Sequence, residues 1–221
     1  DFYAEQNSIR NSLTRELNHR VKNTLANVLS IVALTRRRAT SLQEFASGLD
    51  GRIRALSATH DLLTQSEWGT TPLKAVLDAE LAPYANSAES VLDLSGPAVD
   101  LAPNDALSFG LAIHELATNA SKYGALSVEG GALKVHWTRL RDELVEVVWE
   151  EANGPPVSQE RSRGFGTELI EKIVAHELKH PVDLDFAREG VRCVLRVPVR
   201  KPTEFRMRAK RKRLTDDMPT D

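Results

Sequence analysis

A histidine and an asparagine one helical turn apart form the first group of residues that could do chemistry. His19 stands in the segment Glu16-Leu17-Asn18-His19-Arg20-Val21-Lys22-Asn23. It lies two residues from Leu17 and from Val21, which belong to an apolar helical seam, so it is expected on the polar face with Asn23. An imidazole is largely neutral at pH 7 and keeps a free ring-nitrogen lone pair, which makes it a competent nucleophile. The alternative is an ordinary solvated surface histidine.

A second group lies in the segment AIHELATNASKYG, residues 112–124. Four polar side chains share one helical face there, opposite an apolar face, and they are Glu115, Asn119, Lys122 and Tyr123. A carboxylate beside an amide oxygen suits Mg²⁺, and a nearby lysine can neutralise the charge of a phosphate. An ordinary solvated helix face is the alternative interpretation.

Two further groups follow along the chain. Trp149 and Glu151 point to the same side of a predicted strand, where the carboxylate could accept a hydrogen bond from an adenine amine; a surface acid at the end of a strand is the alternative. The segment Gly164-Phe165-Gly166-Thr167 opens a predicted helix, and its flexible backbone and free N–H groups suit a phosphate chain. A tight turn that happens to use glycine would look the same.

Composition limits the class of protein. The chain has 221 residues, of which 41% are hydrophobic and 27% charged, so wholesale disorder is excluded. No apolar run approaches the roughly 18 to 20 residues of a membrane helix, and the first residues lack the features of a signal peptide. The net charge of −2 gives no overall attraction to nucleic acid, and the single cysteine, Cys193, fits a reducing cytoplasm. The helical start without an initiator Met suggests a piece of a longer protein.

The first elements that must position these groups are two long helices. Residues 5–38 carry an apolar seam at steps of three and four, formed by Ile9, Leu13, Leu17, Val21, Leu25, Val28 and Val32. After a short break, a second series follows, formed by Leu42, Phe45, Leu49, Ile53, Leu56, His60 and Leu63. The short connection predicts an antiparallel hairpin, which needs a second copy or a docked domain to bury its seam. His60, on that seam, is expected to be a packed core histidine.

A second region is predicted beyond the turn-rich segment 68–72. Helices are expected at 73–84, 104–122 and from about 166 to 179, and strands near 90–95, 132–139, 143–151, 182–187 and 190–199. The fold class is therefore α+β, a helical hairpin followed by a two-layer sandwich of helices on a mostly antiparallel sheet. Cys193 is expected in the core of the last strand, and residues 200–221 form a basic tail that is expected to be disordered.

The order of these groups resembles a sensor histidine kinase. His114 together with Trp149 and Glu151 is similar to the HWE family, a branch close to the HisKA_2 type. The resemblance runs from about residue 13 to 199. It implies a dimerisation and phosphoacceptor hairpin at 5–66, a homodimer through it, and a Bergerat-type (GHKL) ATP-binding domain at 70–199. It also implies a response regulator receiver domain as partner and a sensor domain upstream.

The resemblance assigns roles residue by residue. His19 would be the phosphoacceptor, and Asn23 would have a phosphatase role toward the regulator. Asn119 would be the Mg²⁺ ligand, with Glu115 as its catalytic neighbour ordering metal or water. The remaining residues implied in binding ATP are His114, Lys122, Tyr123, Trp149, Glu151, Gly154, Gly164, Phe165, Gly166 and Thr167.

The sequence departs from the family pattern at two places. Many histidine kinases have an acid directly after the phosphoacceptor, whereas Arg20 stands here, so Glu16 is only a candidate for orienting His19. Asn153 stands where the family usually has Gly, and Pro155 where other histidine kinases have a second Gly. A dimeric scaffold or phosphorelay domain with a degenerate ATP site therefore stays an alternative, and a nucleic-acid-binding module based on the basic tail is a third interpretation.

Overall fold

The computed structural model describes residues 2–67, 69–85, 91–141, 143–157 and 165–199. Two long helices come first, α1 (Phe2–Arg38) and α2 (Leu42–Gln65). The other elements, in chain order, are β1 (Thr71–Pro72), α3 (Leu73–Ala85), β2 (Val91–Ser95), β3 (Asp100–Leu101), α4 (Pro103–Tyr123), η1 (Ala125–Ser127), β4 (Ala132–Arg141), β5 (Leu144–Ala152), α5 (Phe165–Glu168), η3 (Leu169–Val174), α6 (Ala175–Leu178), β6 (Asp183–Ala187) and β7 (Gly190–Pro198). The predicted α+β class is confirmed, and the basic tail lies outside the described residues.

The turn between α1 and α2 is closed by local hydrogen bonds. Ser41 caps α2, because its side chain accepts a hydrogen bond from the Glu44 backbone N–H at 3.1 Å. The Glu44 carboxylate in turn accepts from the backbone N–H and the hydroxyl of Thr40, at 2.9 and 2.7 Å. This exchange resembles a capping box and fixes the direction in which α2 starts.

Five strands form the main sheet in the order β2-β4-β5-β7-β6. Its β2–β4 pair is parallel and the other three pairs are antiparallel, as predicted for a mostly antiparallel sheet. Alternation along the strands sends one set of side chains into the core, namely Leu133, Val135, Trp137, Val145, Val147, Trp149, Cys193, Leu195 and Val197. Cys193 is buried there, which confirms the expectation for it.

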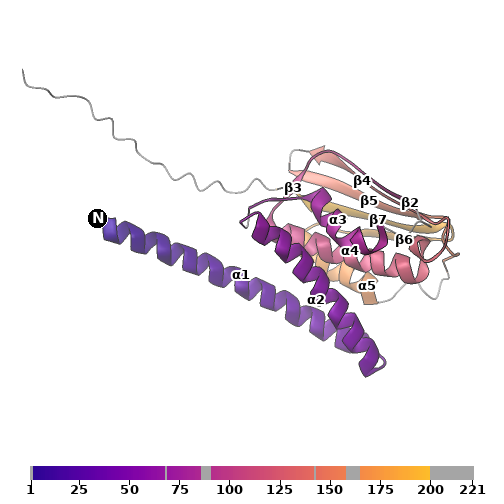
Figure 1. The fold of residues 1–221 in the computed structure, drawn as a ribbon, viewed down its shortest axis with the longest axis horizontal. Coiled ribbons are helices and arrows are strands. Elements are labelled where there is room, and N and C mark those ends of the chain that lie inside the picture. The colour runs from indigo at the N-terminus through magenta and orange to yellow at the C-terminus, as the bar shows by residue number, and fades with distance from the viewer. Residues whose placement is uncertain (1, 68, 86–90, 142, 158–164, 200–221) are drawn as a thin grey trace, which may run out of the picture.

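Helices cover the inner face of this sheet, and α2 lies against them on the far side (Figure 1). The buried face of α2 consists of Ala55, Leu56, Thr59 and Leu63. Leu56 and Leu63 belong to the same core as α3, α4 and the sheet. A Cβ on Gly110 of α4 would collide with the Thr59 hydroxyl, so the two helices approach closely at that point. The predicted docked domain therefore covers α2.

The apolar seam of α1 is buried only in part. Val28 and Val32 are half-buried and Ile31 is buried, but the N-terminal half of α1 extends away from the rest of the fold (Figure 1). Six large apolar side chains between residues 9 and 29 of α1 are exposed, namely Ile9, Leu13, Leu17, Val21, Leu25 and Leu29. On α2, Leu42 is 81% exposed, because the buried face of that helix is turned toward α4.

None of the helices in the described part of the chain is long and apolar enough to cross a membrane.

Candidate functional site

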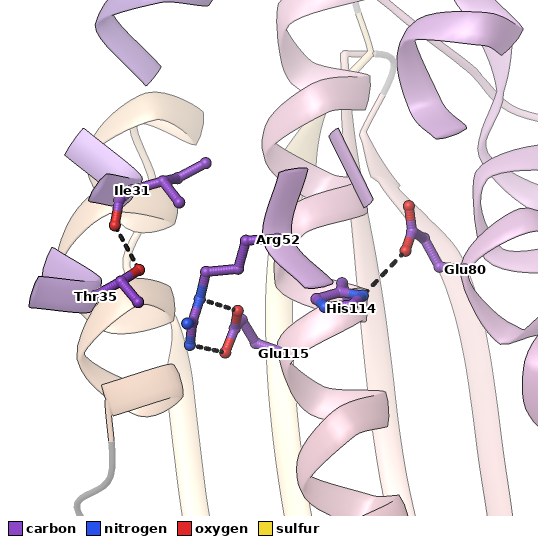
Figure 2. Close-up of polar contacts among 6 residues, drawn as sticks. All are labelled: Ile31, Thr35, Arg52, Glu80, His114 and Glu115. Carbon is purple, nitrogen blue, oxygen red and sulfur yellow. Dashed lines mark hydrogen bonds and ion pairs between the residues drawn. The ribbon is translucent and has the colours of Figure 1, made fainter. Parts of the chain in front are cut away.

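Glu115 is held by an arginine that comes from the hairpin (Figure 2). The Arg52 guanidinium on α2 contacts both carboxylate oxygens, with Nε 2.6 Å from Oε1 and Nη2 3.0 Å from Oε2. The two side chains are only 11% and 4% exposed. A two-point pair of this kind is geometrically specific as well as strong. The interpretation of the Glu115 face of α4 as an ordinary solvated surface is therefore wrong at its centre.

The backbone of Gly166 lies against the same carboxylate. A Cβ at this position would come 2.7 Å from Glu115 Oε2 and 3.2 Å from Asn119 Nδ2. Two groups more than forty residues apart in the sequence thus meet at one place. Their donor set is a carboxylate and an amide oxygen, which fits the few oxygen ligands that Mg²⁺ takes from proteins. Within the described ranges, no cluster of three or more His, Cys, Asp or Glu side chains could hold a metal by itself.

Lys122 and Tyr123 continue the face of α4 toward the start of α2. Both are exposed, and Asn119 is half-buried. The pKa of Glu44 is lowered, first by its hydrogen bonds from Thr40 and also by the charge of Lys122, so Lys122 lies within electrostatic range of α2. The polar face of α4 is therefore bordered by the hairpin along much of its length.

His114 lies on the side of α4 that faces α2 and α3. Its Nδ1 is 3.5 Å from Glu80 Oε2 on α3 (Figure 2). A Cβ on Gly51 of α2 would lie 3.5 Å from His114 Nε2. The other Glu80 oxygen accepts from the Thr59 hydroxyl at 3.3 Å. The described contacts of His114 thus join three helices, α2, α3 and α4.

Glu151 ends β5 with both oxygens hydrogen-bonded. The Trp149 indole N–H donates to Oε1 at 2.9 Å, and the Ala125 backbone N–H donates to Oε2 at 3.1 Å. Burial raises the pKa of this carboxyl, and the two hydrogen bonds oppose that shift. Trp149 itself is fully buried, and its indole N–H helps to hold the Glu151 carboxylate in place. A carboxylate has about four acceptor positions, which leaves capacity for a further donor.

Three glycines converge on Ala125 beside Glu151. A Cβ on Gly154 would come 2.8 Å from the Ala125 nitrogen, and a Cβ on Gly131 would collide with the Ala125 carbonyl. A Cβ on Gly124 would collide with Glu151 Oε2. Gly154 is therefore required by packing at this turn. Its neighbour Asn153 has φ 58°, a left-handed conformation that asparagine tolerates better than most residues.

The segment that opens α5 is described only from Phe165 onward. Gly164 lies outside the described residues, and of Phe165 only the backbone is described, as the first residue of α5. Thr167 is buried. The helical run continues through the π-helical segment η3, whose first residue, Leu169, packs with Ile31 of α1 and Leu111 of α4.

His19 and Asn23 are exposed on α1, as expected for its polar face. Glu16 accepts from the Arg20 guanidinium at 2.8 Å, so its described partner is Arg20. His60 is half-buried and lines an open groove of about 570 Å³ between α1 and α2. The expectation that His60 is enclosed in the core is therefore wrong.

Comparison with known proteins decides the family. Residues 16–98 match the model of the HWE histidine kinase family. The chain is 36% identical over 209 residues to blue-light-activated histidine kinase 1 of Erythrobacter litoralis, across 91% of this chain and 58% of that protein. It is 34% identical over 190 residues to the blue-light-activated histidine kinase of Brucella ovis, across 85% of this chain and 39% of that protein. The chain belongs to the HWE histidine kinase family.

Solved structures agree with this family in fold. The histidine kinase domain of a blue-light-activated histidine kinase from Erythrobacter litoralis superposes with a TM-score of 0.57 at 16% identity, covering 79% of this chain and 96% of that one. A longer structure of a blue-light-activated histidine kinase from the same organism gives 0.62 at 19% identity, covering 83% and 58%. This HWE-family chain spans little more than half the length of the first curated relative, and less of the others.

Sequence reasoning missed the residues through which this HWE-family chain joins its hairpin to α3 and α4. Arg52 lies 63 residues before Glu115, and Thr59 and Glu80 stand on different helices. No local spacing connects them. One usable signal was present: Gly51 and Arg52 interrupt the apolar series of α2 with a small and a charged residue on the face that turns toward α4.

Proposed function

We propose that this chain is the kinase core of a two-component system, in which His19 accepts the γ-phosphoryl group of Mg-ATP and passes it to an aspartate of a response regulator. Residues 5–66 would form the phosphoacceptor hairpin and 70–199 the ATP-binding domain. The observation that supports this most is the meeting of Gly166 with Glu115 and Asn119, since it assembles two distant groups beside a buried carboxylate.

Each group at the site has a distinct part in this proposal. Mg²⁺, when bound, would neutralise the charge of the phosphates. Asn119 and Glu115 would hold it through their oxygens, and Lys122 would face the phosphates. Glu151 would accept a hydrogen bond from the adenine amine while Trp149 and Ala125 keep its carboxylate in place.

The acceptor step needs an exposed, unprotonated imidazole. His19 is exposed on α1, so its ring nitrogen can be approached by the γ-phosphorus. A nitrogen–phosphorus bond forms as the bond between the γ-phosphorus and the bridging oxygen breaks, and ADP leaves. The protein contributes alignment and charge neutralisation, as in other phosphoryl transfers. Asn23 is exposed on the same helix, where it can meet an incoming regulator.

A scaffold with a degenerate ATP site was suggested by Asn153 in place of glycine. Asn153 takes a positive φ of 58°, the kind of conformation for which glycine is used. The substitution therefore leaves this backbone turn intact, and we favour an active site over a degenerate one.

Incubation with γ-labelled ATP and Mg²⁺ tests the proposal. We expect acid-labile, alkali-stable labelling that is lost in His19→Ala, while ATP binding measured by calorimetry persists because the nucleotide groups lie on other elements. His176→Ala is the matched control, since His176 is an exposed histidine on α6. Full labelling of His19→Ala would show that His19 is not the acceptor.

A further inference from the structure

The hairpin covers the side of α4 on which the proposed phosphate-binding residues lie. Arg52 contacts both oxygens of Glu115, Glu44 lies within electrostatic range of Lys122, and Ile31 packs on Leu169 three residues after Gly166. The first and third of these are contacts and the second is electrostatic, and each relates a hairpin residue to a residue in or beside the proposed site. The same surface therefore cannot be fully available to the hairpin and to a nucleotide at once.

Arg52 gives Glu115 a positively charged partner, as a metal ion would. A guanidinium that contacts both oxygens of a carboxylate balances its charge and occupies about two of its roughly four acceptor positions. Glu115 is only 4% exposed, so its remaining positions are enclosed by the protein. A divalent cation held by Glu115 and Asn119 must therefore displace Arg52 or share the carboxylate with a second positive charge beside it.

The described arrangement also keeps the acceptor away from the site. Ile31, where α1 touches the start of η3 and Leu111 of α4, lies twelve residues after His19, which corresponds to about 18 Å along the helix axis. His19 itself is exposed. Phosphoryl transfer requires contact between the reacting atoms, so α4 must leave its present place on α2 before transfer to the His19 of the same chain.

We propose that the Arg52–Glu115 pair is an autoinhibitory latch that Mg-nucleotide binding opens by competing with Arg52 for the Glu115 carboxylate. This regulation rests on the function proposed above. Loss of Arg52 leaves Glu115 buried without a partner in the closed arrangement but solvated in the open one, so the variant shifts the equilibrium toward opening.

Labelling kinetics test the latch with a matched control. Arg52→Gln should raise the initial rate of His19 labelling about tenfold or more and lower the Mg²⁺ concentration for half-maximal labelling, because a partnerless buried charge strongly disfavours the closed state. Arg52→Lys, which keeps the charge but not the two-point geometry, should fall between. Arg54→Gln is the control, since Arg54 lies on the same helix in an exposed pair with Asp50 and should leave both quantities unchanged.

A distance between two labels tests the same latch without using activity. Gln43→Cys on α2 and Thr138→Cys on β4 are exposed positions on the two sides of the interface. Burial raises the pKa of the native Cys193 thiol to about 12, so it stays unlabelled. In the parent, the distance should increase when Mg²⁺ and a non-hydrolysable ATP analogue are added. In Arg52→Gln, it should already be long without them.

The outcomes distinguish a failure of the latch proposal from a failure of the proposed kinase function. A parent distance unchanged at the highest nucleotide concentration, or an Arg52→Gln variant with the parent's closed distance, overturns the latch. Distances that respond as expected in a chain that never labels on histidine overturn the proposed function and leave the latch standing. Equal labelling rates in the parent and Arg52→Gln, with circular dichroism confirming that both are folded, also reject the latch.

Discussion

Glu151 shows how one carboxyl group can serve both the fold and a binding site. It is buried at the end of β5, yet its two oxygens are held by N–H donors from Trp149 and Ala125. These bonds offset part of the desolvation that raises its pKa. The Trp-x-Glu pattern is therefore a local device, since Trp149 shares a sheet face with Glu151 and donates directly to it. The sequence spacing alone predicts that shared face, but not the Ala125 contact.

Glu151 should make stability depend on pH in a definite direction. Because its pKa in the fold is above the ordinary value of 4.5, the folded state holds this proton more tightly than the unfolded state does. The contribution of Glu151 to the unfolding free energy is thus fullest at or below pH 4.5 and falls as pH rises through the interval between 4.5 and the raised value. Glu151→Gln should remove this component.

Urea unfolding at a series of pH values measures the effect. The unfolding free energy of the parent minus that of Glu151→Gln should decrease as pH rises above 4.5. The glutamine side chain itself changes the unfolding free energy by an amount that does not vary with pH, so it does not affect this trend. Glu129→Gln, at an exposed loop residue, is the control. A difference that stays flat with pH would contradict the assigned burial effect.

At the scale of elements, η1 follows α4, precedes β4 and contacts β5 through the hydrogen bond from Ala125 to Glu151. Gly124, Gly131 and Gly154 each lack the Cβ that would collide with Ala125 or Glu151. Their convergence holds the Ala125 N–H over the Glu151 carboxylate. Gly154, predicted as a nucleotide contact, is thus also required for packing.

Gly131→Ala should destabilise the fold more than a change at Gly130, the residue before it. Its new Cβ would collide with the backbone carbonyl of Ala125, which cannot move as a side-chain end could, so we expect a loss of about 1 to 3 kcal/mol or more. Gly130→Asn is the control, because Gly130 has φ 79° and open space around its Cβ position. Asparagine tolerates that conformation, and thermal melts should separate the two variants.

Periodicity predicted the long elements because burial imposes it on them. Alternate side chains of β4, β5 and β7 enter the core, so these sequences record their surroundings. Helix α4 is buried at every position from Asp105 to Ile113 and shows a polar face only after that. The strands β1 and β3 have two residues each, which is too short for a periodic sequence pattern. The π-helical segment η3 and the contact of Arg52 with Glu115 depend on partners far away in sequence, and no local spacing encodes them.

At the scale of the whole molecule, one core spans α2, α3, α4 and the sheet, and among the described residues of α1 none before Val28 belongs to it. Residues of α2 and α4 pack at close approach at Gly110, and Gly51 of α2 lies in ordinary contact distance of His114. The N-terminal half of α1 presents a row of exposed apolar side chains that includes Leu13, at 65%, and Leu17, at 61%. Such a row at helical spacing is typical of an interaction face.

A second copy of the chain is the partner that we expect on this row, in keeping with the predicted homodimer. Each leucine that becomes buried contributes about 1.5 to 3 kcal/mol, and in a symmetric dimer every position counts twice. Leu13→Lys combined with Leu17→Lys should therefore weaken self-association more than about a hundredfold. Sedimentation equilibrium should show a dimer for the parent and a monomer for this variant. The variant should keep the thermal stability that the parent has over residues 70–199.

The matched control carries the same added charge on the opposite side of α1. Ser8→Lys combined with Asn11→Lys changes exposed residues that lie roughly half a turn from Leu13 and Leu17, so it should leave the dimer intact. If the control variant dissociates as well, charge on α1 and not its apolar row governs association. A parent that is monomeric at all concentrations would instead leave the row to a different partner, and the homodimer prediction would be wrong.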